Sequence, residues 1–213
     1  MKVAYTVSSG PELIRNIKIS LASIEKFFEP KEIIIFYTPP RTLEDEVFLS
    51  KYDLRERPKM ELGGTYDPQM TRSYFEEIED DILFFLDTDT EMFRDPRDLL
   101  EGDFDMRCEA RTDVEGYEAH VGTQFFIFKN GTHRKIAKLW RDKYLEVEKV
   151  VNTLLAGPTD EVALYWAVIE SKIKVMPLPP GALAGDQIPK HPELIPTEGT
   201  YVIHYGLRGK KCS

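Results

Sequence analysis

Short apolar runs alternate along this chain with longer segments in which apolar residues recur every three or four positions. The first two runs, Lys2–Val7 and Ile33–Tyr37, predict buried strands, and the prolines after Thr38 would end the second. Between these runs the spacing of apolar residues predicts one helix. Its apolar positions are Leu13, Ile14, Ile17, Leu21, Ile24 and Phe28.

The same alternation continues to the end of the chain. An apolar run at 82–86 predicts a third strand, and a short helical stripe leads into it. That stripe consists of Met70, Tyr74 and Ile78. Further strands are predicted near residues 105–109, 121–128, 173–176 and 201–204.

Two amphipathic helices are predicted in the second half. The longer one is expected to bury Ile136, Leu139, Trp140, Tyr144, Val147, Val151 and Leu154. The later one begins at Asp160 and is expected to bury Val162, Tyr165, Trp166 and Ile169. Buried strands that alternate with amphipathic helices predict an α/β fold with a mixed, mostly parallel sheet and helices on both faces. We expect a single domain over residues 1–213, with a surface loop in the Pro- and Gly-rich segment 177–196.

Charge and cysteine content narrow the classes of function. A formal net charge of −9 opposes non-specific binding of nucleic acid or of an anionic membrane surface. Cys108 and Cys212 lie far apart in a chain without a recognisable secretory leader, so we expect no disulfide framework and a cytoplasmic protein. No apolar stretch approaches the roughly 20 residues that a membrane span requires.

Two carboxylates follow directly after the apolar run at 82–86. Residues two apart on a strand point to the same side, so Asp87 and Asp89 project together at the carboxyl end of that strand. Ligands of α/β sheets bind at such ends, and paired carboxylates suit a hard cation. A purely structural role stays open, because aspartates at strand ends also stabilise turns.

The residues that follow Asp87 and Asp89 argue against several other kinds of site. A phosphatase of the haloacid dehalogenase type would need Thr where Glu91 stands, and an EF-hand loop would need Gly where Met92 stands. Neither a GxGxxG turn nor a GxxxxGK[ST] loop occurs. A bound metal ion would therefore have to supply the positive charge for any phosphate ligand.

Five segments follow one another along the chain in the order found in a known family. In chain order they are Thr71-Arg72-Ser73-Tyr74, the run 82–86 with Asp87-Thr88-Asp89, the strand at 121–128, Thr159-Asp160-Glu161-Val162, and residues 202–210. Together they resemble the nucleotide-sugar glycosyltransferases of the GT-A (Rossmann-like) fold. The greatest similarity is to the group of glycogenin and the lipopolysaccharide galactosyltransferases, which is glycosyltransferase family 8.

The resemblance implies roles for one set of residues in binding metal and nucleotide. Asp87, Asp89 and His204 would hold Mn²⁺ or Mg²⁺ against the donor diphosphate, with Asp87 also touching the nucleotide. Arg72 and Lys210 would contact the diphosphate, and Ser8 lies where such enzymes seat the base. From the residues alone, a solvated Arg72 and a merely packed His204 remain alternatives.

The part of the family pattern that binds the sugar is altered in this chain. The family has Asn-x-Gly in the strand at 121–128, where this chain has Gly122 and Gln124. Asp160 matches the residue that binds the transferred sugar, and Glu161 replaces an amide, as in inverting enzymes with a general base there. Purely structural roles are the alternatives. Gln124 could be buried with its hydrogen bonds made by the backbone, and the helix dipole favours carboxylates such as Asp160 and Glu161 at a helix N-terminus whatever the function.

The resemblance implies a metal-dependent hexosyltransferase. Its donor would be a nucleotide diphosphate sugar, with a UDP-sugar favoured, and its acceptor a hydroxyl of a glycan, lipid or protein. Catalytic roles would fall to Asp160, Glu161 and Gln124. Two alternatives are a sugar-phosphate nucleotidyltransferase, disfavoured by the lack of a Gly-rich basic segment after the first strand, and a non-catalytic nucleotide-sugar-binding protein with a decayed site.

Overall fold

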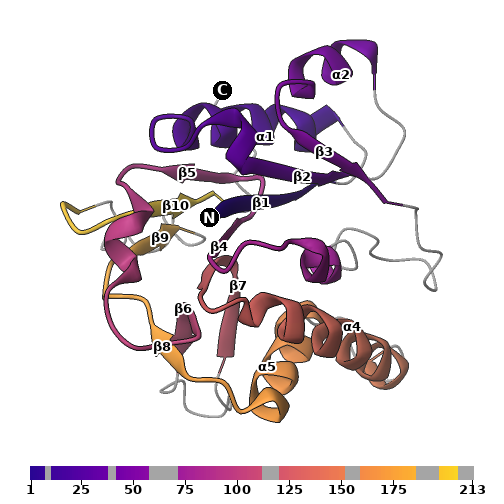
Figure 1. Cartoon of the computed structure of the whole chain (residues 1–213), viewed down its shortest axis with the longest axis vertical. Helices are drawn as coiled ribbons and strands as arrows, with labels where there is room; N and C mark the ends of the chain where they lie inside the picture. Colours follow the sequence, from indigo (N-terminus) through magenta and orange to yellow (C-terminus); the bar gives the residue numbers. More distant parts are fainter. Residues whose placement is uncertain are drawn as a thin grey trace.

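The computed structural model describes residues 1–7, 11–37, 42–57, 72–111, 120–151, 159–185 and 197–205. Within these residues a seven-stranded sheet has the order β3-β2-β1-β4-β7-β6-β8 (Figure 1). The strands are β1 (Lys2–Val7), β2 (Ile33–Tyr37), β3 (Asp53–Glu56), β4 (Leu83–Leu86), β6 (Met106–Arg111), β7 (His120–Phe128) and β8 (Val175–Pro177). All pairings are parallel except those that β7 makes with β4 and β6.

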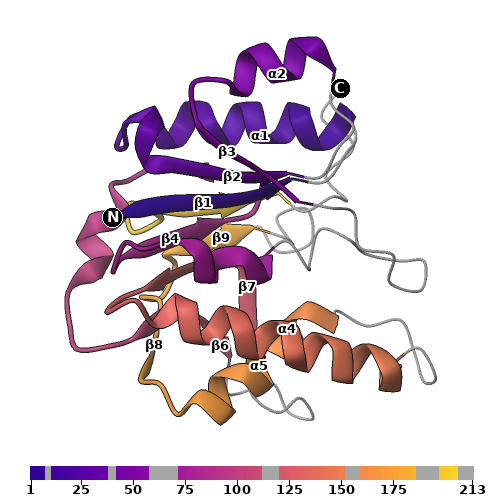
Figure 2. The same ribbon diagram turned by 45° about the vertical axis from the view of Figure 1, so that its right-hand side comes forward.

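Alternate residues of the central strands face two different cores. Val3 and Tyr5 of β1 pack with α1 (Pro11–Ile24), whereas Ala4 faces α4 (Thr132–Val151) and α5 (Thr159–Ser171). Figures 1 and 2 show α1 and α2 (Leu43–Leu49) on one side of the sheet and α4 and α5 on the other. The predicted mixed sheet with helices on both faces is therefore confirmed.

A second, three-stranded sheet packs beside α1. Its order is β5-β10-β9, from β5 (Thr90–Met92), β10 (Val202–His204) and β9 (Leu183–Gly185). Met92 and Val202 are fully buried in the same core as the inner face of α1. Short 3-10 helices complete the described chain: η1 (Pro30–Glu32), η2 (Arg72–Glu77) and η3 (Pro96–Leu100).

An aromatic cluster holds β7 against the helices of the second core. Phe126 stacks on Phe85 of β4 with ring centroids 4.5 Å apart and meets Trp140 of α4 edge-on at 6.0 Å. Phe75 of η2 closes the cluster. Such pairs add to the stabilisation that comes from burying their area, so β7 is fixed firmly at this end.

Two local expectations are corrected by the structure. On α5 the buried apolar residues are Ala163, Leu164 and Ala167, while three of the four predicted ones are exposed. Those three are Val162 at 42%, Trp166 at 48% and Ile169 at 47% exposure. The small alanines let α5 lie close to α4 and β7, and the bulky residues face outward. The expected loop at 177–196 also contains β9, which pairs in parallel with β10.

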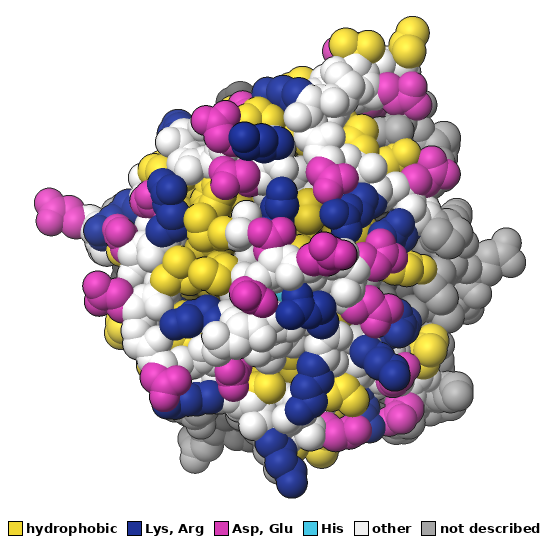
Figure 3. Space-filling view, viewed as in Figure 1, with side chains coloured by type: hydrophobic (Ala, Val, Ile, Leu, Met, Phe, Trp, Pro, Cys, Tyr) yellow, Lys and Arg dark blue, Asp and Glu magenta, His cyan; other side chains and the backbone are white. Residues whose placement is uncertain are grey.

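The surface carries both charges in close mixture. On the face seen in Figure 3, Lys and Arg side chains alternate with Asp and Glu without a large area of one sign. None of the described helices is long and apolar enough to cross a lipid bilayer.

Candidate active site

The acidic pair lies in the turn that connects the two sheets. β4 ends at Leu86, and β5 of the smaller sheet begins at Thr90. The backbone N–H of Asp87 donates to the carbonyl of Gln124 at 2.9 Å, which extends the pairing of β4 with β7 by one residue. Asp89 follows where the chain leaves the large sheet. The turn is thus anchored to both sheets.

A buried row of hydroxyl groups supports this turn. Thr90 Oγ1 donates to the carbonyl of Asp87 at 2.6 Å and lies 3.2 Å from Ser20 Oγ on α1. Ser20 Oγ is in turn 3.0 Å from the Tyr5 hydroxyl. Each hydroxyl has one proton to donate, so the donations run from Tyr5 through Ser20 and Thr90 to Asp87. Burial raises the pKa of Tyr5 well above its usual value, which keeps its proton in place.

His204 reaches the acidic pair from the other end of the sequence. It is the last residue of β10, which runs antiparallel to β5 and places His204 opposite Thr90. The Tyr205 N–H donates to the Asp89 carbonyl at 3.0 Å. His204 Nε2 then lies 3.1 Å from Asp89 Oδ1 and 3.9 Å from Asp87 Oδ2.

These three side chains fit a single divalent cation. One ligand atom from each of Asp87, Asp89 and His204 lies within 4.8 Å of the others, and the side chains are 11–18% exposed. Ligands bound at about 2.1 Å to one Mg²⁺ or Mn²⁺ lie roughly 3 Å or more from one another, which matches this spacing. Two carboxylates and one imidazole suit Mn²⁺ or Mg²⁺ better than a soft metal. Among the described residues this is the one such group of His, Cys, Asp and Glu.

A glycine on β9 sets the position of His204. Gly185 is the parallel partner of His204 and has φ of 142°. A Cβ at this glycine would stand 1.9 Å from the His204 carbonyl oxygen. Any side chain at 185 would therefore displace the backbone of His204.

Gln124 connects the candidate metal ligand Asp87 to the start of α5. Its carbonyl accepts from Asp87, and its side-chain Nε2 donates to Glu161 Oε1 at 3.2 Å. Asp160, the residue before, is buried at 5% exposure, and its carbonyl accepts from Trp140 Nε1 at 2.9 Å. The structure thus brings Gln124 and Glu161 together, and Asp160 precedes Glu161 on the same helical turn.

A wide irregularity in β7 surrounds Gln124. Cys108 and Ala110 of β6 pair with Phe126 and Val121 of β7. One residue, Glu109, separates the two positions on β6, whereas four residues separate them on β7. Bulges of this kind re-aim side chains and are common beside active sites. Sequence reasoning did not identify Glu109, and no motif would have indicated it, because it faces β7 only through this shift in register.

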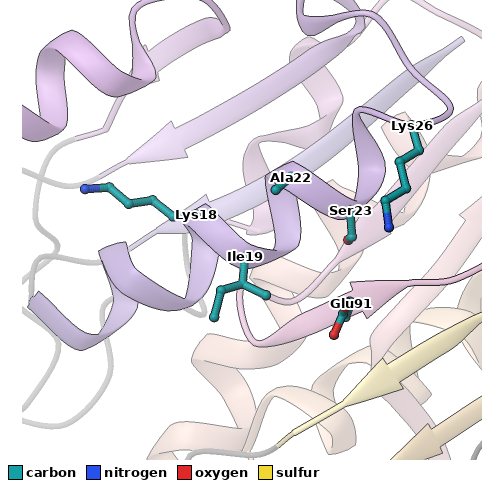
Figure 4. A pocket seen from close by; sticks show the side chains of 6 residues that line it. All are labelled: Lys18, Ile19, Ala22, Ser23, Lys26 and Glu91. Atoms are coloured by element: carbon teal, nitrogen blue, oxygen red, sulfur yellow. The ribbon is translucent and has the colours of Figure 1, made fainter.

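A shallow groove lies on the far side of β5. Lys18, Ile19, Ala22, Ser23 and Lys26 of α1 line it together with Glu91, around a volume of about 380 Å³ (Figure 4). Glu91 also accepts a hydrogen bond of 2.6 Å from the Tyr205 hydroxyl. The groove neighbours the metal ligands along β5 and β10, but none of the three lines it.

Three of the predicted site residues cannot be placed from the structure. Ser8 and Lys210 lie outside the described residues. Arg72 begins η2, but its side chain is not among those described. Their suggested contacts with nucleotide and diphosphate therefore remain predictions.

The fold has clear counterparts among solved structures. Glycosyltransferase GlyE of Streptococcus pneumoniae TIGR4 superposes with a TM-score of 0.64 over 96% of this chain, at 14% identity. Galactosyltransferase LgtC, solved with donor and acceptor sugar analogues, gives 0.61 over 97% at 11% identity. This chain has the GT-A fold. The match covers 54% of the GlyE chain and 87% of the LgtC chain, so this chain spans about half of GlyE. No family model and no curated protein matches the sequence.

Proposed function

We propose that this chain is a metal-dependent glycosyltransferase that moves a hexose from a nucleotide diphosphate sugar, with UDP-sugars favoured, to an acceptor hydroxyl. The observation that carries the proposal is the meeting of His204 with Asp87 and Asp89 on a GT-A fold. These ligands come from β10 and from the turn after β4, which are far apart in sequence. GlyE is a glycosyltransferase and LgtC a galactosyltransferase, and we extend that class of activity to this chain.

The roles of the residues follow from the chemistry of the leaving group. Cleavage of the bond between sugar and phosphate leaves extra negative charge on the diphosphate, which a bound Mn²⁺ or Mg²⁺ stabilises as a Lewis acid. Asp87, Asp89 and His204 would hold that ion in place. Arg72 and Lys210 would neutralise the remaining phosphate charge.

The start of α5 would handle the sugar and the acceptor. Asp160 would bind sugar hydroxyl groups, and Glu161, held by Gln124, would accept the acceptor proton or orient the sugar. The anomeric configuration of the product, determined by NMR, separates these two roles. An inverted product requires a base and supports Glu161 in that role, whereas a retained product leaves Glu161 to orient the sugar.

Calorimetry with and without Mn²⁺ tests the function directly. We expect UDP and one UDP-sugar to bind only when Mn²⁺ is present, and that sugar to be hydrolysed slowly or transferred. Asp89→Ala should abolish the Mn²⁺-dependent binding. Asp98→Ala, which removes the same charge from an exposed position on η3, should not.

Two outcomes would contradict the proposal. If neither UDP- nor GDP-sugars bind or turn over, the chain is not an enzyme of this class. If Asp89→Ala binds and reacts as the wild type does, the metal group is not the functional one. Binding without any turnover would instead favour a non-catalytic nucleotide-sugar-binding protein.

A further inference from the structure

Resting on the proposed function, we propose that Tyr165 and Trp166, on the outward side of α5, form a platform that binds a sugar ring of an oligosaccharide acceptor. The ring on the platform lies beyond the sugar that receives the hexose, so the platform selects sugar chains over free monosaccharides. Trp166 is thus a specificity-determining residue outside the part of the site that holds the donor.

The helix α5 is apolar on more sides than its packing uses. Its inner side packs on α4 and β7 through small residues, as described above. Its outward side carries three large apolar side chains, each between 42% and 48% exposed. These are Val162, Trp166 and Ile169. A helix that is apolar all round is normally covered on all sides, so the outward side indicates a binding surface.

Two adjacent aromatic residues form the centre of this surface. The rings of Tyr165 and Trp166 meet edge-to-face, with centroids 5.7 Å apart and planes at 67°. Tyr165 is partly buried and packs against the core that faces α4 and α5, so it holds the indole in place. The electron-rich face of an indole attracts the weakly positive C–H groups on one face of a pyranose ring. Because Trp has only two side-chain torsions, binding orders little that is not already ordered.

The size and the charge of the surface favour a sugar chain over a protein partner. Residues 162–169 span about 10 Å of helix axis, which is the length of a short run of sugar rings. A stable protein interface buries roughly 800 Å² on each partner, far more than three side chains on one helix supply. The three outward side chains are uncharged, which suits a neutral glycan.

The platform continues from the candidate active site along the same helix. Glu161, whose carboxylate accepts from Gln124 Nε2 at 3.2 Å, lies one turn before Tyr165. Residues four apart on a helix share a face. Trp166 is the next residue, about 7.5 Å along the helix axis from Glu161. An acceptor whose terminal sugar lies beside Glu161 therefore places a later sugar on Trp166.

Binding of oligosaccharides tests the platform directly. A glycan array, probed with and without Mn²⁺ and UDP, identifies an oligosaccharide that the wild type binds, and calorimetry gives its dissociation constant. Trp166→Ala should weaken this binding by about 10-fold, whereas Trp166→Phe, which keeps an aromatic face, should stay within about three-fold. Phe93→Ala is the matched control, because Phe93 is 47% exposed and follows β5, which lies apart from α5 in Figures 1 and 2. Its binding should equal that of the wild type.

Acceptor kinetics separate selectivity from catalysis. Trp166→Ala should raise KM for the oligosaccharide by about 10-fold and leave kcat unchanged, because the platform contacts neither the donor nor the reacting atoms. KM for the donor and KM for the corresponding monosaccharide acceptor should also be unchanged. A merely structural role would instead impair the reaction with both acceptors. Circular dichroism and thermal unfolding would verify that the variant is folded.

The outcomes separate this inference from the proposed function. If UDP does not bind with Mn²⁺, the proposed function fails and the inference falls with it. If UDP binds but no oligosaccharide on the array does, or if Trp166→Ala binds and reacts as the wild type does, the inference alone is overturned. It is also overturned if the wild type sediments as a dimer that Trp166→Ala dissociates, because the surface is then an interface between two copies of the chain.

Discussion

The two parts of the candidate site are built in opposite ways. The part that would hold the metal consists of Asp87, Asp89 and His204, and each is fixed by strand pairing or by a backbone hydrogen bond within one of the two sheets. The part that would hold the sugar lies on an irregular stretch of β7 and retains an unsatisfied Gln124 oxygen. A cation accepts a narrow range of ligand geometry, so its site is rigid before binding. A sugar can complete a polar network that the protein leaves open.

The largest expected effect comes from a change of one charge that should impair the sugar part of the site and spare the metal part. Glu161→Gln keeps an oxygen for the Gln124 amide but removes the carboxylate. We expect kcat to fall by about 100-fold, the low end of a general base contribution, while the dissociation constants of Mn²⁺ and UDP stay within about two-fold. Steady-state kinetics and calorimetry measure these quantities. A parallel loss of Mn²⁺ binding would show that the two parts are not independent.

A glycine substitution should damage the metal part without removing a ligand. In Gly185→Ala the added methyl collides with the His204 backbone, and Mn²⁺ affinity should fall by about 10-fold or more. Gly199→Ala is the matched control, since its Cβ would meet only Thr197 Oγ1 at 3.6 Å. Equal Mn²⁺ affinity in both variants would mean that His204 does not depend on β9 for its position.

Removal of one supporting hydroxyl should have a smaller effect. Thr90→Val deletes the bond to the Asp87 carbonyl and should lower the free energy of unfolding by about 1–2 kcal/mol and Mn²⁺ affinity a few-fold. Ser171→Ala loses a similar bond, to the Val168 carbonyl, far from the metal ligands. Urea unfolding should show a lower free energy of unfolding in both variants. Calorimetry should show a weaker Mn²⁺ affinity in Thr90→Val alone.

The smallest expected effect is on the free energy of unfolding at acid pH, and it comes from His133, which lies outside both parts of the site. Burial lowers the pKa of His133, as does nearby Arg134, although its hydrogen bond to the Ile78 carbonyl opposes this. Its Nδ1 is buried without a partner, so an added proton would find no acceptor. Below the unfolded-state value of about 6.5 the unfolded chain takes up the proton first, and stability falls as pH falls.

His133→Gln should flatten that dependence. Between pH 7 and pH 5 its free energy of unfolding in urea should decline less steeply than that of the wild type. The pH dependence of Mn²⁺ affinity should be the same in both proteins, because His133 is not near the metal ligands. An unchanged slope of stability would assign the acid sensitivity to other groups.

Much of the fold could be predicted from periodicity. The runs at β1, β2, β4 and β7 are apolar enough to be recognised as buried strands, and the inner face of α1 follows from regular spacing. On α5 the same reasoning failed, because that helix is apolar on several sides. Close packing against α4 then selected Ala163 and Ala167 over the larger residues. The three residues of β9 contain Gly185 and show no period, so the second sheet was missed.

The site shows the same division. The proximity of His204 to Asp89 was predicted through family resemblance, and the structure brings the two together. Glu109 escaped prediction because its position depends on how β6 pairs with β7, and register is a property of two strands together. Gly122 was noticed only as a departure from the family pattern, and the structure shows that the side chains of Gln124 and Glu109 fill the position where its Cβ would be.

The indole of Trp140 gives this molecule a built-in optical reporter. The chain has two tryptophans, of which Trp166 is 48% exposed and Trp140 only 2%. A water-soluble quencher such as iodide would quench the fluorescence of the exposed Trp166 and leave that of the buried Trp140 unchanged. Because Trp140 Nε1 donates to the carbonyl of Asp160, its emission wavelength reports directly on the first turn of α5. Any displacement of this turn when a ligand binds would therefore change the Trp140 emission without an added label.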